Sequence, residues 1–298
     1  MYDAHVHLID PGTFSYPWME AAPSELHGRF WLEDLLHDTD DSGINGFILV
    51  QTHSSVSETL EYLNIAHSNE TVSGVIGWLD LTSATISDDL AALQDGLGSD
   101  HMVGLRHQVE DESDPGWLIR PDVLSGLAAL EGSGLVFDLL VRTEHLDAAT
   151  EAVKRNPGLD FVVDHLAKPP TNDADMAIWE ARLQLLSNYP NVYAKVSGLG
   201  SHAADGPRFS SRIQNVVEIA LDAFGPQRLI FGSDWPIARV TDDYSGVLVK
   251  TRDSLRAFGL SASELADVFL HNTKRIYSLP LNDQKTERTP LAPERKNP

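Results

Sequence analysis

The chain contains no cysteine. It therefore has no disulfide framework, no thiolate nucleophile and no thiolate metal site. No apolar run approaches the roughly 18 to 20 residues that a membrane helix needs. The first residues, from Met1 to His5, show neither the basic region nor the apolar core of a signal peptide. These absences predict a cytoplasmic protein without a membrane partner.

The sequence is also poor in positive charge. It has 22 Lys and Arg residues against 44 Asp and Glu residues, which gives a formal net charge of −22. Such a surface repels nucleic acid at long range, so no nucleic-acid partner is expected. The potential inside a pocket depends on a few local Arg or Lys side chains, so the expected partner is a small molecule of either charge. The oligomeric state stays open, a homo-oligomer included.

What the sequence does contain is a regular series of short β-rich runs. With 298 residues, 42% of them hydrophobic, the chain can bury one large core. Several runs are apolar at consecutive positions, such as Phe47 to Val50, which is typical of parallel strands covered on both faces. The expected strands are residues 2–7, 46–51, 74–80, 103–108, 135–141, 161–165, 192–196 and 229–232.

Amphipathic helical patterns separate these runs. Ser261 and Glu264 form a capping-box pattern that opens a last helix, which is expected to end near Tyr277. Strict alternation of strand and helix indicates parallel βαβ units. Eight such units in under 300 residues favour a single (β/α)8 barrel over residues 1–279. Residues 280–298 are polar, rich in proline and aperiodic, and are expected to form a disordered tail.

Ionisable and polar residues gather where the expected strands end. In an α/β barrel these ends point into the active site, and a purely structural barrel would not need so many charged groups there. The residues concerned are His5, His7, Gln51, Arg106, His107, Asp138, His165, Lys195 and Asp234.

His5 and His7 stand two residues apart on the first strand, so both imidazoles can enter one pocket. Two imidazoles at this spacing suit a divalent metal, whereas a plain structural role is a hydrogen-bonded pair at a strand end. Asp234 follows the last strand, where it can take a proton from water or cap a turn before Pro236. Together with the two histidines, the catalytic interpretation of Asp234 is preferred.

His165, Lys195 and Arg106 complete the expected chemistry. His165 could donate a hydrogen bond or a proton to a carbonyl oxygen or a leaving group, and Lys195 could stabilise an oxyanion. Arg106 and His107 are expected to bind substrate oxygens or a carboxylate. The alternative for these cations is an internal salt bridge with Asp138.

The motifs in this order resemble the amidohydrolase superfamily, and within it the branch of sugar lactonases. The resemblance runs from Asp3 to about Tyr277. It rests on Asp3-Ala4-His5-Val6-His7, Tyr16-Pro17-Trp18, Gly104-Leu105-Arg106-His107, Asp164-His165-Leu166-Ala167-Lys168-Pro169, Lys195-Val196-Ser197-Gly198-Leu199 and Gly232-Ser233-Asp234-Trp235-Pro236.

This resemblance implies a distorted TIM barrel and hydrolysis of a small sugar-acid lactone. It carries over a catalytic or metal-binding set, His5, His7, His165 and Asp234. The further candidates for substrate contacts are Gln51, Asp138, Trp235 and Trp18. The resemblance leaves two options for the cofactor: one divalent ion, zinc, on His5, His7 and Asp234, or catalysis without a metal.

The sequence departs from metal-dependent members of the superfamily at strands four and five. Those members often carry a metal-binding histidine, or a bridging lysine or glutamate, where this chain has Arg106-His107 and Asp138. A binuclear centre is therefore not expected. Two alternatives to the lactonase remain, namely a metal-dependent decarboxylase or other amidohydrolase, and a sugar-acid binding protein without activity.

Overall fold

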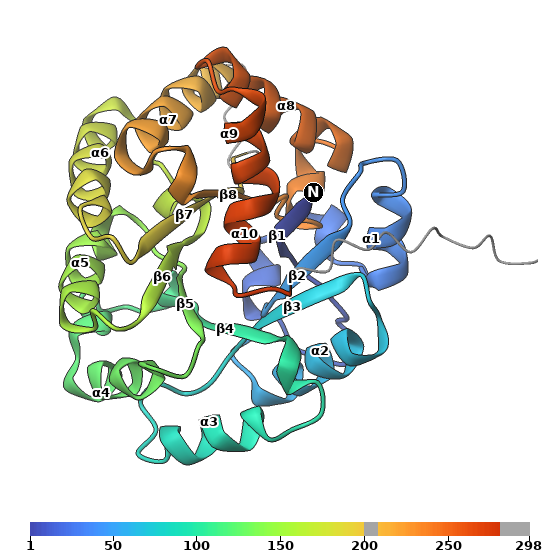
Figure 1. The fold of residues 1–298 in the computed structure, drawn as a ribbon, viewed down its shortest axis with the longest axis vertical. Helices are drawn as coiled ribbons and strands as arrows, with labels where there is room; N and C mark the ends of the chain where they lie inside the picture. Colours follow the sequence, from blue (N-terminus) through green and yellow to red (C-terminus); the bar gives the residue numbers. More distant parts are fainter. Residues whose placement is uncertain (200–207, 281–298) are drawn as a thin grey trace, which may run out of the picture.

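A computed structural model describes residues 1–199 and 208–280, without the side chains of residues 208–212. Its eight parallel strands pair in chain order and curl into a barrel (Figure 1). The strands are β1 (Tyr2–Val6), β2 (Gly46–Val50), β3 (Val72–Gly77), β4 (Met102–His107), β5 (Val136–Leu139), β6 (Asp160–Val163), β7 (Val192–Val196) and β8 (Leu229–Phe231).

Most helices surround the barrel on its outside, and the last two lie across one of its ends (Figure 1). The α-helices are α1 (Leu32–Asp38), α2 (Val56–Ser68), α3 (Ile86–Gln94), α4 (Pro121–Leu130), α5 (Leu146–Arg155), α6 (Asp173–Ser187), α7 (Arg208–Phe224), α8 (Tyr244–Ala257), α9 (Ala262–Ala266) and α10 (Asn272–Ile276). The predicted (β/α)8 barrel is confirmed, although β3 begins and ends earlier than the segment 74–80. The predicted tail lies outside the described residues except for Pro280.

The capping box predicted for the last helix is present. The backbone N–H of Glu264 donates to Ser261 Oγ, and the Glu264 carboxylate accepts from the backbone N–H of Ser261 at 2.8 Å. A π-helical turn, Asp267–His271, joins α9 to α10. The helix predicted to end near Tyr277 is thus three consecutive helical segments.

The interior of the barrel has two layers of side chains. The lower layer, toward the N-terminal ends of the strands, is apolar, and the upper layer, toward their C-terminal ends, is polar. Three neighbouring strands each place one side chain in each layer, because alternate residues of a strand point to the same side. These pairs are Val136 and Asp138 on β5, Val162 and Asp164 at the end of β6, and Tyr193 and Lys195 on β7. Below them Ile276, Tyr277 and Leu279, at the end of α10, belong to the apolar cluster.

Contacts between β1 and the segment after β8 close the barrel at its upper end. The backbone N–H of Asp234 donates to the carbonyl of His5 at 2.9 Å, and that of His7 to the carbonyl of Trp235 at 2.7 Å. The buried Asp3 carboxylate accepts from the backbone N–H of Ser233 and from the hydroxyl of Tyr244. Burial raises the pKa of Asp3 to about 6. This seam fixes Asp234 beside the histidines of β1.

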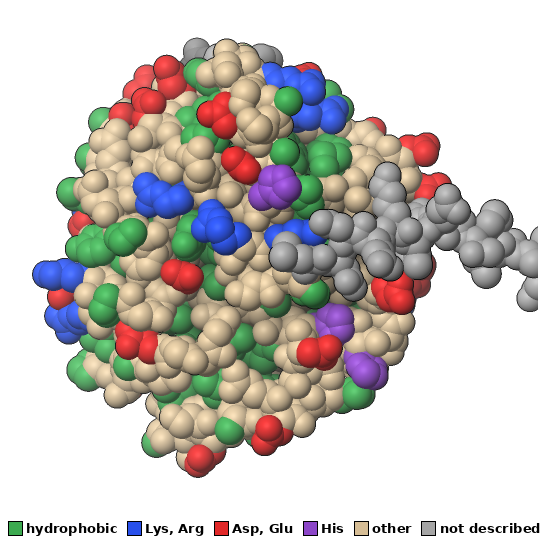
Figure 2. All heavy atoms as spheres, in the orientation of Figure 1, with side chains coloured by type: hydrophobic (Ala, Val, Ile, Leu, Met, Phe, Trp, Pro, Cys, Tyr) green, Lys and Arg blue, Asp and Glu red, His purple; other side chains and the backbone are tan. Residues whose placement is uncertain are grey.

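The acidic excess of the chain is dispersed on the face that Figure 2 presents. Asp and Glu side chains are scattered there among several Lys and Arg side chains and do not gather into one patch. Among the described residues, no helix has the length and apolar character needed to cross a bilayer.

Candidate active site

A cavity of about 320 Å³ lies at the C-terminal ends of the strands. One wall is apolar and comes from the long loop after β1 and from the segment after β8, with Trp18, Ala22, Pro23, Leu26, Ile237 and Val240. The rest of the lining, here called the polar wall, is polar except for Leu140 and comes mainly from the loops after β2, β4, β5 and β6. The volume of the cavity suits a ligand about the size of a sugar ring.

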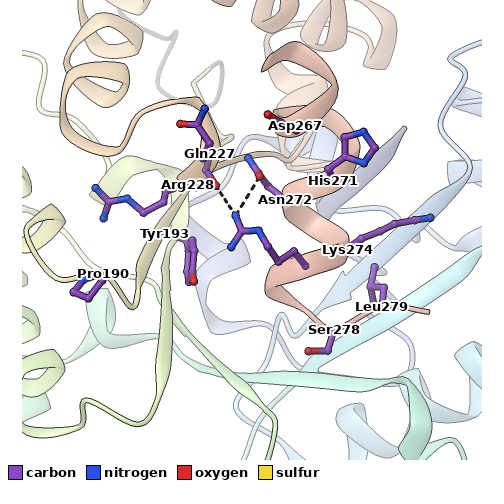
Figure 3. Close-up of a pocket in the computed structure, with 11 residues that line it drawn as sticks. Pro190, Tyr193, Gln227, Arg228, Asp267, His271, Asn272, Lys274, Ser278 and Leu279 are labelled. Atoms are coloured by element: carbon purple, nitrogen blue, oxygen red, sulfur yellow. Dashed lines mark hydrogen bonds between the residues drawn. The ribbon is translucent and has the colours of Figure 1, made fainter. Parts of the chain in front are cut away.

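A larger groove, about 770 Å³, lies at the other end of the barrel (Figure 3). Its cations hold loops in place. Arg228 donates to the carbonyls of Ser187, Tyr189 and Val192, and Arg275 donates to the carbonyl of Gln227. None of the residues predicted to be catalytic lines this groove, so the smaller upper cavity is the candidate active site.

His5, His7 and Asp234 converge at the floor of the upper cavity. The Nε2 atoms of His5 and His7 lie 3.1 Å apart. Asp234 Oδ1 lies 3.8 Å from Nε2 of His5 and 3.5 Å from Nε2 of His7. All three residues are almost fully buried. The structure thus brings together the three side chains that the sequence proposed as one set.

The Nδ1 atoms of both histidines contact groups other than Asp234. Nδ1 of His7 lies 2.8 Å from the carbonyl of Val50, and because a carbonyl only accepts, Nδ1 carries the proton. Nδ1 of His5 lies 3.3 Å from Asp164 Oδ1 and 3.2 Å from Lys195 Nζ, so either tautomer has a partner there. Nε2 of His7 then has no proton, and its lone pair faces Asp234. The same holds for Nε2 of His5 when Nδ1 of His5 donates to Asp164.

This donor set fits one metal ion. Two imidazole nitrogens and a carboxylate oxygen lie within 4.8 Å of one another, and imidazole–imidazole–carboxylate sets with an open fourth position are common at catalytic zinc. Outer nitrogens bonded to a carbonyl or a carboxylate are also typical of metal-binding histidines. A second group, His5, Asp164 and His165, has comparable spacing. Two cations already contact Asp164 there, which disfavours a second ion.

His165 reaches the cavity through an unusual turn. Four consecutive residues, His165 to Lys168, have φ between +50° and +59°, in the left-handed region that L-residues seldom adopt. Nδ1 of His165 lies 2.9 Å from Ser197 Oγ, and its Nε2 lies 3.9 Å from Asp234 Oδ1. Burial lowers the pKa of His165 to about 4, so the imidazole is neutral at neutral pH. Such a run of left-handed residues at a cavity is typical of a functional site.

Asp234 also has a left-handed backbone, with φ of +63°. Burial opposes its ionisation, but the surrounding histidines outweigh burial and hold the pKa of this carboxyl well below its usual range, His165 having the largest effect among them. Asp234 is therefore a carboxylate at neutral pH. A buried carboxylate beside neutral imidazoles can accept a proton from water.

Beneath this floor, the Asp164 carboxylate lies between two buried cations. Arg106 Nη1 lies 3.0 Å from its Oδ2, and Lys195 Nζ lies 3.0 Å from its Oδ1. Lys195 also pairs with Asp138, which accepts from the hydroxyl of Tyr277 at 3.0 Å. Burial raises the pKa of Asp138, whereas Lys195 and His5 hold the pKa of Asp164 well below its usual range against the effect of burial.

The structure separates the predicted substrate contacts into two groups. Trp18 and Arg106 line the cavity, as do His7, His165 and Asp234. The other proposed contacts do not line the cavity. Gln51, Asp138 and Lys195 are fully buried beneath its floor. His107 and Trp235 lie to the side of the cavity.

His107 and Trp235 have partners away from the cavity. His107 stacks on Trp117 with ring centroids 4.1 Å apart and contacts Glu112 through Nε2 at 2.8 Å. Trp235 is buried and donates from Nε1 to Asp38. The end of a strand fixes where a side chain starts but not which way it turns, so a contact with substrate did not follow from position alone.

Two features of the site were not predicted from the sequence: a role for Asp164, and a charged cluster of Glu110, Arg142 and Lys168 on the cavity wall. Asp164 stands two residues after the inward-facing Val162, so strand alternation could have found it. The charged cluster comes from three loops, whose geometry no periodic pattern predicts.

Comparisons with known proteins identify relatives that match nearly the whole chain. The family model for amidohydrolases matches residues 2–279. An L-fucono-1,5-lactonase of Burkholderia ambifaria is 30% identical over 290 residues, 96% of this chain and 98% of that protein. An L-fucono-1,5-lactonase of Burkholderia multivorans is 32% identical over 291 residues, 93% and 96% of the two chains. A crystal structure of an amidohydrolase from Burkholderia multivorans with bound Zn is 30% identical, with a TM-score of 0.86 over 94% of this chain and 99% of that chain.

The first prediction concerns the buried charges. Asp164→Asn should lower the free energy of unfolding by about 3 to 5 kcal/mol, because it leaves Arg106 buried without its carboxylate. Urea unfolding followed by circular dichroism measures the change. Asp122→Asn is the control, since it breaks the exposed Arg120–Asp122 pair and should change stability little. Equal effects of the two variants would contradict the prediction.

Proposed function

The chain belongs to the amidohydrolase family, and we propose that it is a hydrolase of small sugar-acid lactones. In the proposed reaction, water attacks the lactone carbonyl and the ring opens. The observation that carries the proposal is an ionised Asp234 in contact with three buried histidines at the floor of a sugar-sized cavity. The two relatives named as L-fucono-1,5-lactonases, matched over nearly their whole length, support the same reaction class.

Asp234 is the proposed general base. Its carboxylate is ionised throughout the neutral range. It can therefore orient a water molecule and take its proton as the bond to the carbonyl carbon forms. The water oxygen bonds to the carbonyl carbon, and the ring C–O bond then breaks. Asp234 returns the proton to the leaving ring oxygen. A lactone is a reactive ester, so this step does not demand a strong electrophile.

His165 and Arg106 are the proposed partners of the carbonyl oxygen. If Ser197 donates to Nδ1 of His165, the ring proton lies on Nε2, the atom that faces Asp234. A neutral imidazole in that state donates a hydrogen bond without losing its proton. Arg106 lines the same cavity, and its Nη atoms contact Asp164, His5 and Gln51, so it supplies a fixed positive charge to the carbonyl oxygen. Donors that are already oriented stabilise the negative charge that develops on the oxygen.

Lys195, which the sequence suggested as an oxyanion donor, has a different proposed role. Its ammonium is fully buried between Asp138 and Asp164, and it is not among the residues lining the cavity. We infer that Lys195 acts through Asp164 and His5, whose ring it contacts at 3.2 Å. It is then a positioning residue that never touches the substrate.

We further infer that His5, His7 and Asp234 hold a single zinc ion. The geometry of the three donor atoms and the bound Zn in the related amidohydrolase support this assignment. When bound, such an ion polarises water or a carbonyl oxygen. The residues described above supply the base and the hydrogen-bond donors in either case, so metal content and catalysis are separate questions.

The second prediction tests the base. Asp234→Asn should lower kcat for aldonolactone hydrolysis by about 10² to 10⁴, since an amide cannot accept the proton. Asparagine tolerates a left-handed backbone well, so the thermal midpoint should change little. A pH indicator measures acid release over a panel of aldonolactones, which also separates a hydrolase from a sugar-acid binder. The control Asp10→Asn alters a turn carboxylate that does not line the cavity.

The interpretation of Asp234 as a purely structural cap makes the opposite forecast. Activity per folded molecule would then be retained while the thermal midpoint fell. A variant that kept more than about a tenth of the wild-type kcat would move the base elsewhere, because loss of a base costs more than that.

The third prediction concerns the metal. Wild-type protein dialysed against zinc should retain one equivalent, and His7→Asn should retain much less, because one of three ligands is lost. Elemental analysis gives the content without reference to activity. His37→Asn is the control, since the His37 side chain is 89% exposed. Equal zinc content in wild type and His7→Asn would exclude the assigned site, and the rate of the chelated enzyme would show whether turnover needs the ion.

A further inference from the structure

The polar wall of the cavity carries balanced charge. Apart from the histidines, the ionisable residues that line it are three cations and three carboxylates: Arg106, Arg142, Lys168, Glu110, Asp111 and Asp234. This balance contrasts with the formal net charge of −22 for the whole chain. The side chains that line the cavity, and not the charge of the whole chain, therefore determine the charge of the substrate that binds there.

Glu110 is the carboxylate that pairs with two of these cations. Lys168 Nζ lies 2.5 Å from its carboxylate oxygens, and Arg142 Nη2 lies 3.2 Å from Oε2. The Glu110 and Lys168 side chains are only 11% and 17% exposed. Although burial acts in the opposite direction, Lys168 and Arg142 lower the pKa of Glu110, so it is ionised at neutral pH.

The backbone holds this cluster beside the reaction centre. Glu110 follows β4, Arg142 follows β5 and Lys168 follows β6, so the three lie on adjacent loops. The backbone N–H of Glu110 donates to the carbonyl of Leu140, which ties the first loop to the second. Lys168 ends the left-handed turn that begins at His165, and its backbone N–H donates to the His165 carbonyl at 2.9 Å.

We propose that Glu110 is a specificity-determining residue that restricts the site to uncharged, polyhydroxylated lactones. This proposal rests on the proposed lactone hydrolysis and adds the charge class of the substrate. Ring or side-chain hydroxyls can donate to Glu110 and accept from Lys168 and Arg142 at once. Glu110 and Asp111 together balance the charges of Lys168 and Arg142. A substrate carboxylate at the same position therefore meets no net positive charge and lies next to the negative oxygens of Glu110, so an aldarolactone is disfavoured against the matching aldonolactone.

The experiment compares two substrates that differ only in this charge. One is an aldonolactone with a terminal CH2OH group, and the other is the aldarolactone of the same ring stereochemistry with a terminal carboxylate. Glu110→Gln should raise the ratio of kcat/KM for the aldarolactone over the aldonolactone at least about tenfold, equivalent to about 1.4 kcal/mol. The gain arises because Lys168 and Arg142 lose their partner and become available to a substrate carboxylate.

Two further variants act as controls. Glu112→Gln removes the same charge from the same loop, but Glu112 pairs with His107 and is not among the lining residues, so the ratio should stay at the wild-type value. Glu110→Gln combined with Lys168→Met removes both charges of the pair and should return most of the gained selectivity. If the amide is not tolerated beside two cations, Glu110→Ala makes the same change in charge.

The outcomes separate the two proposals. A folded Glu110 variant whose ratio stays within about twofold of wild type, well below the tenfold change expected from a 1.4 kcal/mol effect, would overturn the role of Glu110 and leave lactone hydrolysis intact. An equal shift in Glu112→Gln would also overturn it, because the effect would then be general electrostatics. Wild-type enzyme that opens no aldonolactone would refute the proposed function itself, and the inference with it.

Discussion

The carboxylate of Asp164 accepts contacts from Arg106, Lys195 and His5 in a region from which water is excluded. Ions buried in this way are tolerated only when each has a partner in good geometry. The four residues come from β1, β4, the end of β6 and β7, so the contact can form only when these strands have the correct register. Once formed, it fixes the ring of His5 and the guanidinium of Arg106, two groups at the floor of the cavity.

The barrel can therefore be described as three levels that depend on one another. Apolar side chains, with Tyr277 from the end of α10, fill the lowest level, and the hydroxyl of Tyr277 reaches up to Asp138. The ion pairs form the middle level. The histidines and Asp234 form the upper one, where the left-handed turn at His165 costs backbone energy that packing beneath it offsets. One such contact is the indole of Trp179, which donates to the carbonyl of Leu166 at 2.8 Å.

The fold followed from the sequence because buried parallel strands are apolar at consecutive positions, and eight such runs leave few alternatives. The gathering of His5, His7 and Asp234 followed from their positions at strand ends. The side chains of His107 and Trp235 turn toward other partners, since stacking on Trp117 and the bond to Asp38 depend on tertiary packing. The Glu110 cluster joins loops far apart in sequence, and no periodicity encodes such a pairing.

The charge of the cavity also bears on the direction of the proposed reaction. An aldonolactone is neutral and enters without a Coulombic cost, whereas its hydrolysis product is a carboxylate formed beside the carboxylate of Asp234. The net charge of −22 acts mostly at distances where salt screens it, so local carboxylates are what the product meets. The product carboxylate forms where the lactone carbonyl was, beside Arg106, and this cation is already paired with Asp164. Pairing of the cavity's cations with carboxylates would therefore disfavour an anionic substrate and favour release of an anionic product.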